Sequence, residues 1–575
     1  MNHAETQSSS PSESALPPSE PRSLAPKRSR PLQWTIIAAV FLLTFALRWP
    51  FLTESFWVDE LHSAWCVADG WNDVAARAKM GNQQPLYFWS LWIWQQIPWP
   101  EPFASYPVES LARLTSLWCV SVSAALIAWG LIRYQGSLLA AAAAGIAFAI
   151  DRQAAFYGVE LRPYAPVILC STLAIGFAAR LWTAPTQPPP PGQRTNWSWA
   201  GLHASVLLAV SMHITSLLTL APLVVAMSAC DLFRRRKNPA ELKHAILRHT
   251  FWLALWAMVG LQLASHQQDV WERRDAWSAF GRPKSIFAIW NMWPWLGWIL
   301  FPAAAAIFSR YSLRFLPKPT NKPRPVEHTS HGPTNAPPPH RGAVSFAILC
   351  SFALVVSVLS AFFLANFLGV PIWHRRYLIA GLPLGCVSLG AWIASIHRPG
   401  HYDLLSPIPI FLSLASVAWT QGSIHPKVAS YWVYRHENWR DAIQQIAAET
   451  ELGPPSDADA MEHHLWIDAD LIEQPTMMGE VTDIELSNYL TLPARGPYTP
   501  GERVILHAVG SVKPMEGWQR AAQSLPRSEP RCKHWFLSRF LPKNQQEIPP
   551  LEGFDRQDYG RFGNIKLYYS IDKQD

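Results

Sequence analysis

Two adjacent carboxylates, Asp59 and Glu60, follow the first apolar run of the chain and are flanked by aromatic side chains. A carboxylate at the end of a membrane helix is costly unless water solvates it or the protein uses it. One use is general-base catalysis, in which the carboxylate takes a proton from a hydroxyl group. On these residues alone, a solvated loop is the competing interpretation.

Four further polar features stand at the edges of apolar runs and could serve the same chemistry. They are the Trp-rich segment 82–89 with Gln84 and Tyr87, the sequence Glu160-Leu161-Arg162-Pro163-Tyr164, the lone His213, and His374-Arg375-Arg376-Tyr377. Each alone is explained by side chains that snorkel to the membrane interface. Their predicted location on one membrane face favours a common site.

The segments that must position these residues are apolar. Hydrophobic residues make up 49% of the 575 residues and charged residues only 15%, well below the roughly 25% that soluble domains carry. Apolar runs recur at about 33–50, 111–132, 137–150, 163–181, 199–211, 215–231, 248–265, 285–308, 343–368, 377–396 and 404–420. We therefore predict an α-helical polytopic membrane protein of about eleven transmembrane helices, with a weak boundary between the two runs that His213 separates.

Basic residues predict the orientation of these helices. They cluster at 22–30, 234–237 and 310–324, which fall on one side if eleven spans are counted, and the positive-inside rule makes that side cytoplasmic. We expect a cytoplasmic, disordered segment 1–32, a transmembrane domain 33–420 with an outer loop 51–110 carrying interfacial helices, and an extracytoplasmic domain 421–575. The protein would lie in the plasma or inner membrane. Because the basic clusters are short and lie between apolar runs, no nucleic-acid partner is expected.

The C-terminal region has a different, mixed polar pattern. A helical stretch at Glu437–Glu451 and alternating segments at Arg503–Val509 and Asn564–Ile571 predict a small soluble α/β domain. The pair His463 and His464 is interpreted as two surface histidines. The seven cysteines show no paired spacing, so they predict neither a disulfide framework nor a zinc site.

The order of these motifs resembles the GT-C membrane glycosyltransferases, most closely the family 39 type that includes protein O-mannosyltransferases and aminoarabinose transferases. The resemblance covers about residues 33–420. It consists of Asp59-Glu60, Pro85-Leu86-Tyr87, Glu160-x-Arg162-Pro163-Tyr164-Ala165, His213, and Arg376-Tyr377-Leu378 with Leu382-Pro383. Each motif is weak alone, whereas the ordered set is specific.

The resemblance implies an inverting transfer of a sugar from a polyprenyl-phosphate donor to a lipid, glycan or protein acceptor at the outer membrane face. Asp59 matches the family's general base, and Glu60 would orient Asp59 or the acceptor. Arg162, Arg376 and, third, Arg375 are candidates for the donor phosphate, because a guanidinium offers a planar pair of hydrogen-bond donors. Other site-lining candidates are Glu160, Tyr164, His213, Gln84, Tyr87 and Tyr377.

One departure from the family pattern concerns donor binding. The family often has Lys or His before Pro-Pro-Leu-Tyr, where this chain has Gln83-Gln84-Pro85. Metal dependence varies within the superfamily, so a requirement for a divalent ion stays open and no metal ligands are assigned.

Two alternative functions also stay open. One is a transporter or flippase of a lipid-linked saccharide, although no internal repeat is seen. The other is a membrane-anchored binding protein that acts through its soluble tail.

Overall fold

The structure of the chain is a computed structural model. It describes residues 30–183, 195–265, 281–315, 339–396, 407–420, 436–451, 461–469, 471, 479–480, 483–510, 523, 532–539 and 554–572. Residues 1–29 of the predicted disordered N-terminus are not among the described residues, and the first helix begins at Arg30. The Pro-rich segment 184–191 and nearly all of 317–339 also lie outside them.

All eleven apolar runs are helical. The corresponding helices are α1 (Arg30–Ala46), α5 (Val108–Gly130), α6 (Leu138–Ala149), α8 (Tyr164–Thr183), α9 (Thr195–Met212), α10 (Ser216–Arg235), α11 (Pro239–Ser265), α14 (Ala288–Met292) with η4 (Leu296–Leu300) and α15 (Phe301–Phe315), α16 (Pro339–Phe367), α17 (Gly381–Ile396) and α18 (Pro407–Thr420). The short elements η3 (Leu131–Gln135), α7 (Arg152–Tyr157) and η5 (Arg375–Leu378) connect them. The two runs around His213 are separate helices, as predicted.

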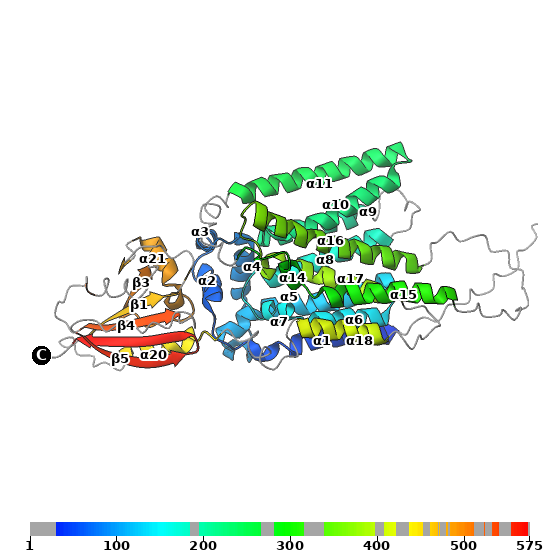
Figure 1. The fold of residues 1–575 in the computed structure, drawn as a ribbon. Coiled ribbons are helices and arrows are strands. Elements are labelled where there is room, and N and C mark those ends of the chain that lie inside the picture. Colours follow the sequence, from blue (N-terminus) through cyan, green and yellow to red (C-terminus); the bar gives the residue numbers. More distant parts are fainter. Residues whose placement is uncertain are drawn as a thin grey trace, which may run out of the picture.

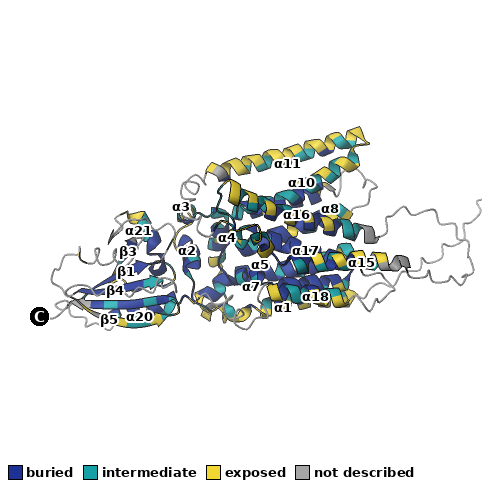
Figure 2. Cartoon of the chain, viewed as in Figure 1, coloured by how far each residue is buried: buried dark blue, intermediate teal, exposed yellow. Residues whose placement is uncertain are grey.

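The helices have the length and surface of a multi-pass membrane protein. Six helical segments among the described residues are long and apolar enough to cross a membrane, and four shorter apolar helices accompany them. Large apolar side chains face outward, including Leu261 on α11 at 74% exposure and Phe411 on α18 at 70%. Figure 2 shows α11 exposed along most of its length. Such a surface is stable in lipid but would be unusual in water.

The loop between the first two spanning helices is itself largely helical. It contains η1 (Trp49–Phe51), α2 (Val58–Cys66), α3 (Asp73–Met80), α4 (Pro85–Gln95) and η2 (Phe103–Ser105). Figure 1 shows α2, α3 and α4 between the membrane helices and the C-terminal sheet. Helix α4 begins at Pro85, which suits the first helical position because its missing N–H would have no partner there.

The C-terminal residues form a mixed six-stranded sheet. The strands are β1 (Glu462–Asp468), β2 (Gly479–Glu480), β3 (Val504–Gly510), β4 (Cys532–Arg539), β5 (Phe554–Phe562) and β6 (Ile565–Asp572), in the order β2-β3-β1-β4-β6-β5. Strand β1 runs parallel to β3 and β4, whereas β6 is antiparallel to both β4 and β5. The domain also contains α20 (Trp439–Glu451), α21 (Ile484–Leu490) and η6 (Leu492–Ala494). This confirms the predicted small α/β unit.

The predicted elements of this domain are shifted by one or two residues. Helix α20 begins at Trp439 rather than at Glu437, because Glu437 forms an isolated β-bridge with Gly563. One face of the sheet packs on α20: Leu465 and Trp535 share a core with Ile443. The prediction that His463 and His464 lie on the surface is wrong. They are only 8% and 6% exposed, because side chains of the flanking strands lie against them: Trp535 contacts His463, and His507 and His534 contact His464.

A single buried arginine connects the first loop to the membrane helices. Arg113, in the second turn of α5, donates to the carbonyl oxygens of Leu52, Glu54 and Ser55. It also donates hydrogen bonds to both carboxylate oxygens of Glu60 on α2. The Nε–Oε1 distance is 2.8 Å and the Nη2–Oε2 distance is 2.5 Å. A guanidinium has five N–H donors, so these contacts employ all of them. Both side chains of the ion pair are fully buried.

We expect Arg113→Ala to destabilise the protein strongly. The change leaves the Glu60 charge and three carbonyl groups buried without their partner, and breaking a buried ion pair from one side costs roughly 3–5 kcal/mol. The measurement is the midpoint of thermal unfolding of the detergent-purified protein, followed by tryptophan fluorescence. Arg133→Ala, at an exposed position on η3, is the matched control. Equal midpoints for the two variants would contradict the anchoring role of Arg113.

Candidate functional site

Three segments that are far apart in the sequence bring Asp59, Arg162 and Arg376 together. Asp59 lies in the first turn of α2, Arg162 two residues before the start of α8, and Arg376 in η5. Nη1 of Arg162 donates to the backbone carbonyl oxygen of Asp59 at 3.0 Å. Nη1 of Arg376 lies 4.0 Å from Oδ2 of Asp59. A carboxylate flanked by two guanidinium groups is therefore the centre of the site.

The start of α2 is held from two directions, which places Asp59. Glu60 accepts from the backbone N–H of Trp57 at 3.4 Å, as a capping glutamate does. The N–H of Val58 donates to the carboxylate of Glu437 in the C-terminal domain at 3.0 Å. The hydroxyl of Tyr498, also from that domain, accepts from the N–H of Phe56 at 2.9 Å. Membrane helices and soluble domain thus both position Asp59.

Opposing effects set the charge of Asp59. Its side chain is 27% exposed. Burial would raise the pKa of its carboxyl group, but the positive charges of Arg162 and Arg376 outweigh burial and hold that pKa below its ordinary value of 3.8. Asp59 is therefore ionised at neutral pH. In this form it can accept a proton.

His62, one helical turn after Asp59, orients Arg162. Burial, followed by the charge of Arg162, lowers the pKa of His62 to about 4, so the ring is neutral at pH 7. Its Nε2 lies 3.1 Å from the carbonyl oxygen of Arg77 and its Nδ1 lies 3.4 Å from Nη1 of Arg162. A proton on Nε2 satisfies both contacts, because Nδ1 then accepts from the arginine. Gly81 is required beside this ring, since a Cβ there would lie 2.3 Å from His62.

Aromatic side chains form the surroundings of the two arginines. The guanidinium of Arg376 lies 5.0 Å from the ring centroid of Tyr377, and its Nη2 donates to the Tyr377 hydroxyl at 3.1 Å. The His213 ring is 6.0 Å from Tyr377 and 5.3 Å from Tyr164. Tyr164 in turn lies 4.5 Å from Tyr157. His213, Tyr164 and Tyr377, all predicted as site residues, are thus brought together.

Two of the buried polar atoms near this centre, one on a guanidinium and one on a phenol, have no hydrogen-bond partner among the described residues. They are Nε of Arg162 and the hydroxyl of Tyr87. Arg162 is 5% exposed and Tyr87 is 2% exposed. A buried donor without a partner costs roughly 1–3 kcal/mol. An anionic ligand beside Arg162 would supply an acceptor.

The remaining predicted residues occupy other positions. Glu60 is turned toward Arg113, and its Oε1 also accepts from the N–H of Leu161 at 2.8 Å, directly before Arg162. Arg375 donates to the carbonyl oxygen of Asn291 at 2.6 Å, away from Asp59. Glu160 is buried, and its backbone carbonyl accepts from Ser116. Gln84 is the buried residue that precedes α4.

Sequence reasoning missed Arg113 and did not assign a role to His62. A usable signal existed for Arg113, because a lone arginine inside an apolar run is costly and must have a partner. No comparable signal identifies His62, whose role depends on Arg162, a hundred residues away. Around Asp59, the described residues provide no three carboxylate, imidazole or thiol groups close enough to share a metal ion. We therefore assign no metal ligands in this site.

Comparisons with known proteins give structural likenesses only. No family model matches the sequence, and no curated protein matches it. Among solved structures, ArnT from Cupriavidus metallidurans bound to undecaprenyl phosphate aligns with 93% of this chain and 97% of its own, at 13% identity and a TM-score of 0.48. The oligosaccharyltransferase AglB from Archaeoglobus fulgidus, with an inhibitory peptide and a dolichol-phosphate, aligns with 82% of this chain and 64% of its own, at 10% identity and a TM-score of 0.41. Both TM-scores are below 0.5, and neither identity exceeds 13%.

Proposed function

We propose that this protein is a GT-C-like membrane glycosyltransferase that transfers a sugar from a polyprenyl-phosphate donor to an acceptor hydroxyl. The observation that carries the proposal is the ionised Asp59 between the guanidinium groups of Arg162 and Arg376. The ordered sequence motifs that resemble this superfamily support it. A base beside a pair of cations suits a reaction in which a hydroxyl loses a proton and a phosphate departs.

The proposed reaction is a single inverting displacement. The acceptor oxygen attacks the anomeric carbon while Asp59 takes the hydroxyl proton. The bond from the anomeric carbon to the phosphate oxygen breaks, and the polyprenyl phosphate leaves with that electron pair. Arg162 and Arg376 stabilise the charge that develops on this phosphate, which is usually the largest catalytic contribution in such sites. The Nε of Arg162 offers an unused donor for it.

Donor binding would also make Asp59 a better base. In the free protein the two arginines lower the pKa of Asp59. A bound phosphate places negative charge beside the same arginines and offsets part of their effect, so the pKa of Asp59 should rise when the donor is present. Glu60 acts in this proposal as a positioning residue, because it connects α2 to Arg113 and to the backbone beside Arg162.

Asp59→Asn provides the main test. The change removes the proton acceptor at nearly constant shape, so donor binding should persist while turnover falls by roughly 100-fold or more. The assay measures transfer from radiolabelled polyprenyl-phosphate sugars to a membrane extract. Asp73→Asn, an exposed position in the same loop, should retain wild-type turnover. Wild-type turnover in Asp59→Asn would refute the assignment, and net movement of an intact lipid-linked saccharide without a new glycosidic bond would identify a transporter.

Arg376→Ala should weaken binding of the polyprenyl-phosphate sugar and change the pH profile. Removing one of the positive charges that lower the pKa of Asp59 raises that pKa, so the loss of kcat/KM on acidification should begin at a higher pH than in the wild type. Binding and initial rates are measured across the acid range. The control is Arg375→Ala, since the Arg375 side chain contacts Asn291 instead. An unchanged donor affinity and acid limb in Arg376→Ala would exclude this role.

We further propose that the site faces the outer side of the membrane. The basic cluster 234–237 begins in the last turn of α10, whereas His213 precedes its first turn, so the cluster and the site lie at opposite ends of this 20-residue helix. Alkaline phosphatase, which is active only after export, should therefore be active when fused after Asp575 and inactive when inserted after Lys237. The reverse pattern would place the site and the C-terminal domain in the cytoplasm.

A further inference from the structure

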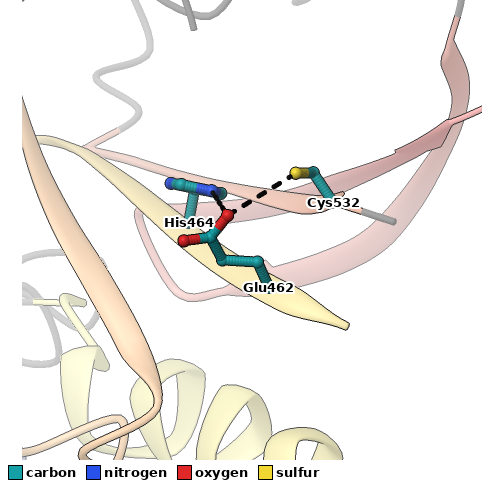
Figure 3. A group of neighbouring side chains, drawn as sticks. All are labelled: Glu462, His464 and Cys532. Carbon is teal, nitrogen blue, oxygen red and sulfur yellow. Dashed lines mark hydrogen bonds and ion pairs between the residues drawn. The ribbon is translucent and has the colours of Figure 1, made fainter. Parts of the chain in front are cut away.

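We propose that the C-terminal domain binds a zinc ion through Glu462, His464 and Cys532. These three side chains converge at the first residues of β1 and β4, where Figure 3 shows them directed toward one another. The site is distinct from the one around Asp59 and does not depend on the glycosyltransferase proposal. The spacing of the cysteines alone predicted no zinc site, and the proposed ligands come from the two neighbouring strands β1 and β4.

The register of two parallel strands assembles the cluster. Glu462 is opposite Cys532, and His464 is opposite His534. Because side chains alternate between the faces of a strand, Glu462 and His464 share one face of β1 and meet Cys532 on the same face of β4. His463 and Lys533 belong to the other face, where Lys533 contacts Glu449 of α20. The nearby lysine charge is therefore directed away from the cluster.

The distances suit ligands around one ion better than direct hydrogen bonds. Nε2 of His464 lies 3.4 Å from Oε2 of Glu462, Sγ of Cys532 lies 3.9 Å from the same oxygen, and all three atoms are within 4.8 Å of one another. Zinc bonds of about 2.0–2.3 Å place tetrahedral ligands roughly 3.3–3.7 Å apart. Small side-chain movements would therefore complete the geometry.

Neighbouring histidines prepare His464 for metal binding. Its Nδ1 lies 3.0 Å from Nε2 of His507. When Nδ1 carries the proton and donates to His507, the lone pair of Nε2 faces Glu462 and Cys532, which is the arrangement of metal-binding histidines and their outer-shell partners. The ring of His534 stacks on His464 at 5.0 Å.

The ligand types select the metal. A thiolate, an imidazole and a carboxylate suit zinc, whereas magnesium and calcium prefer oxygen ligands. Three protein ligands leave a fourth position for water. The side chain of Glu462 is 40% exposed, so solvent reaches the cluster. A bound ion would connect the beginnings of β1 and β4 and stabilise the folded domain.

Cobalt binding to the full-length protein tests this proposal. Co²⁺ replaces Zn²⁺ in such sites, and a cysteine thiolate bound to it gives a near-ultraviolet charge-transfer absorption that carboxylate or imidazole ligands do not give. We expect the chelator-treated, detergent-purified protein to develop this absorption with one Co²⁺ per chain and to lose it when Zn²⁺ is added. Cys532→Ser should abolish the absorption. His464→Ala should weaken binding by at least the roughly 10–100-fold that loss of an outer-shell partner costs.

Matched controls separate this site from other sites and from misfolding. His463→Ala, on the opposite face of the same strand, and Cys230→Ser, on α10, should retain the absorption. In the wild type, Zn²⁺ should raise the midpoint of thermal unfolding, and in Cys532→Ser it should not. Absence of the absorption in the wild type, or its persistence in Cys532→Ser, would show that Glu462 merely accepts hydrogen bonds from His464 and Cys532, and would overturn the proposal.

Discussion

The architecture of the first loop depends on one buried ion pair, between Arg113 and Glu60. Burying two charges is expensive, and the cost is offset only when every donor and acceptor finds a partner in good geometry. Arg113 meets this condition by donating to three loop carbonyls as well as to Glu60. The path of residues 52–60 is consequently fixed against α5. Asp59 precedes Glu60 in α2, so the same ion pair helps to hold Asp59 beside Arg162 and Arg376.

The C-terminal domain completes this arrangement from the opposite direction. Glu437 accepts from the first turn of α2, and it is itself held by Arg539 at 2.7 Å and by the indole N–H of Trp439 at 3.0 Å. Arg440 adds an ion pair with Glu109, at the start of α5. The soluble domain is therefore packed against the segment that carries Asp59. This contact gives the described part of the C-terminal domain a structural role near the site that its sequence did not indicate.

Sequence reasoning predicted the elements well. The apolar runs became helices, and the alternating segments near residues 503 and 564 became β3 and β6. Each pattern reflects whether the segment contacts lipid, water or the protein core, and this preference is a local property of the chain. Asp59, Arg162 and Arg376 were also predicted as site residues, because charges at the ends of apolar helices are costly unless they are used.

The pairing of side chains was decided only by the tertiary structure. Nothing local distinguishes Arg376, which faces Asp59, from Arg375, which faces Asn291, because the two differ only in direction from a short 3-10 helix. Likewise, the sequence made Glu60 a candidate for orienting Asp59 or the acceptor, but packing directs its side chain toward Arg113. The cluster of Glu462 and Cys532 arises from the register of strands 70 residues apart. Contacts between distant segments leave no periodic trace in the sequence, so their partners emerge only when the chain is folded.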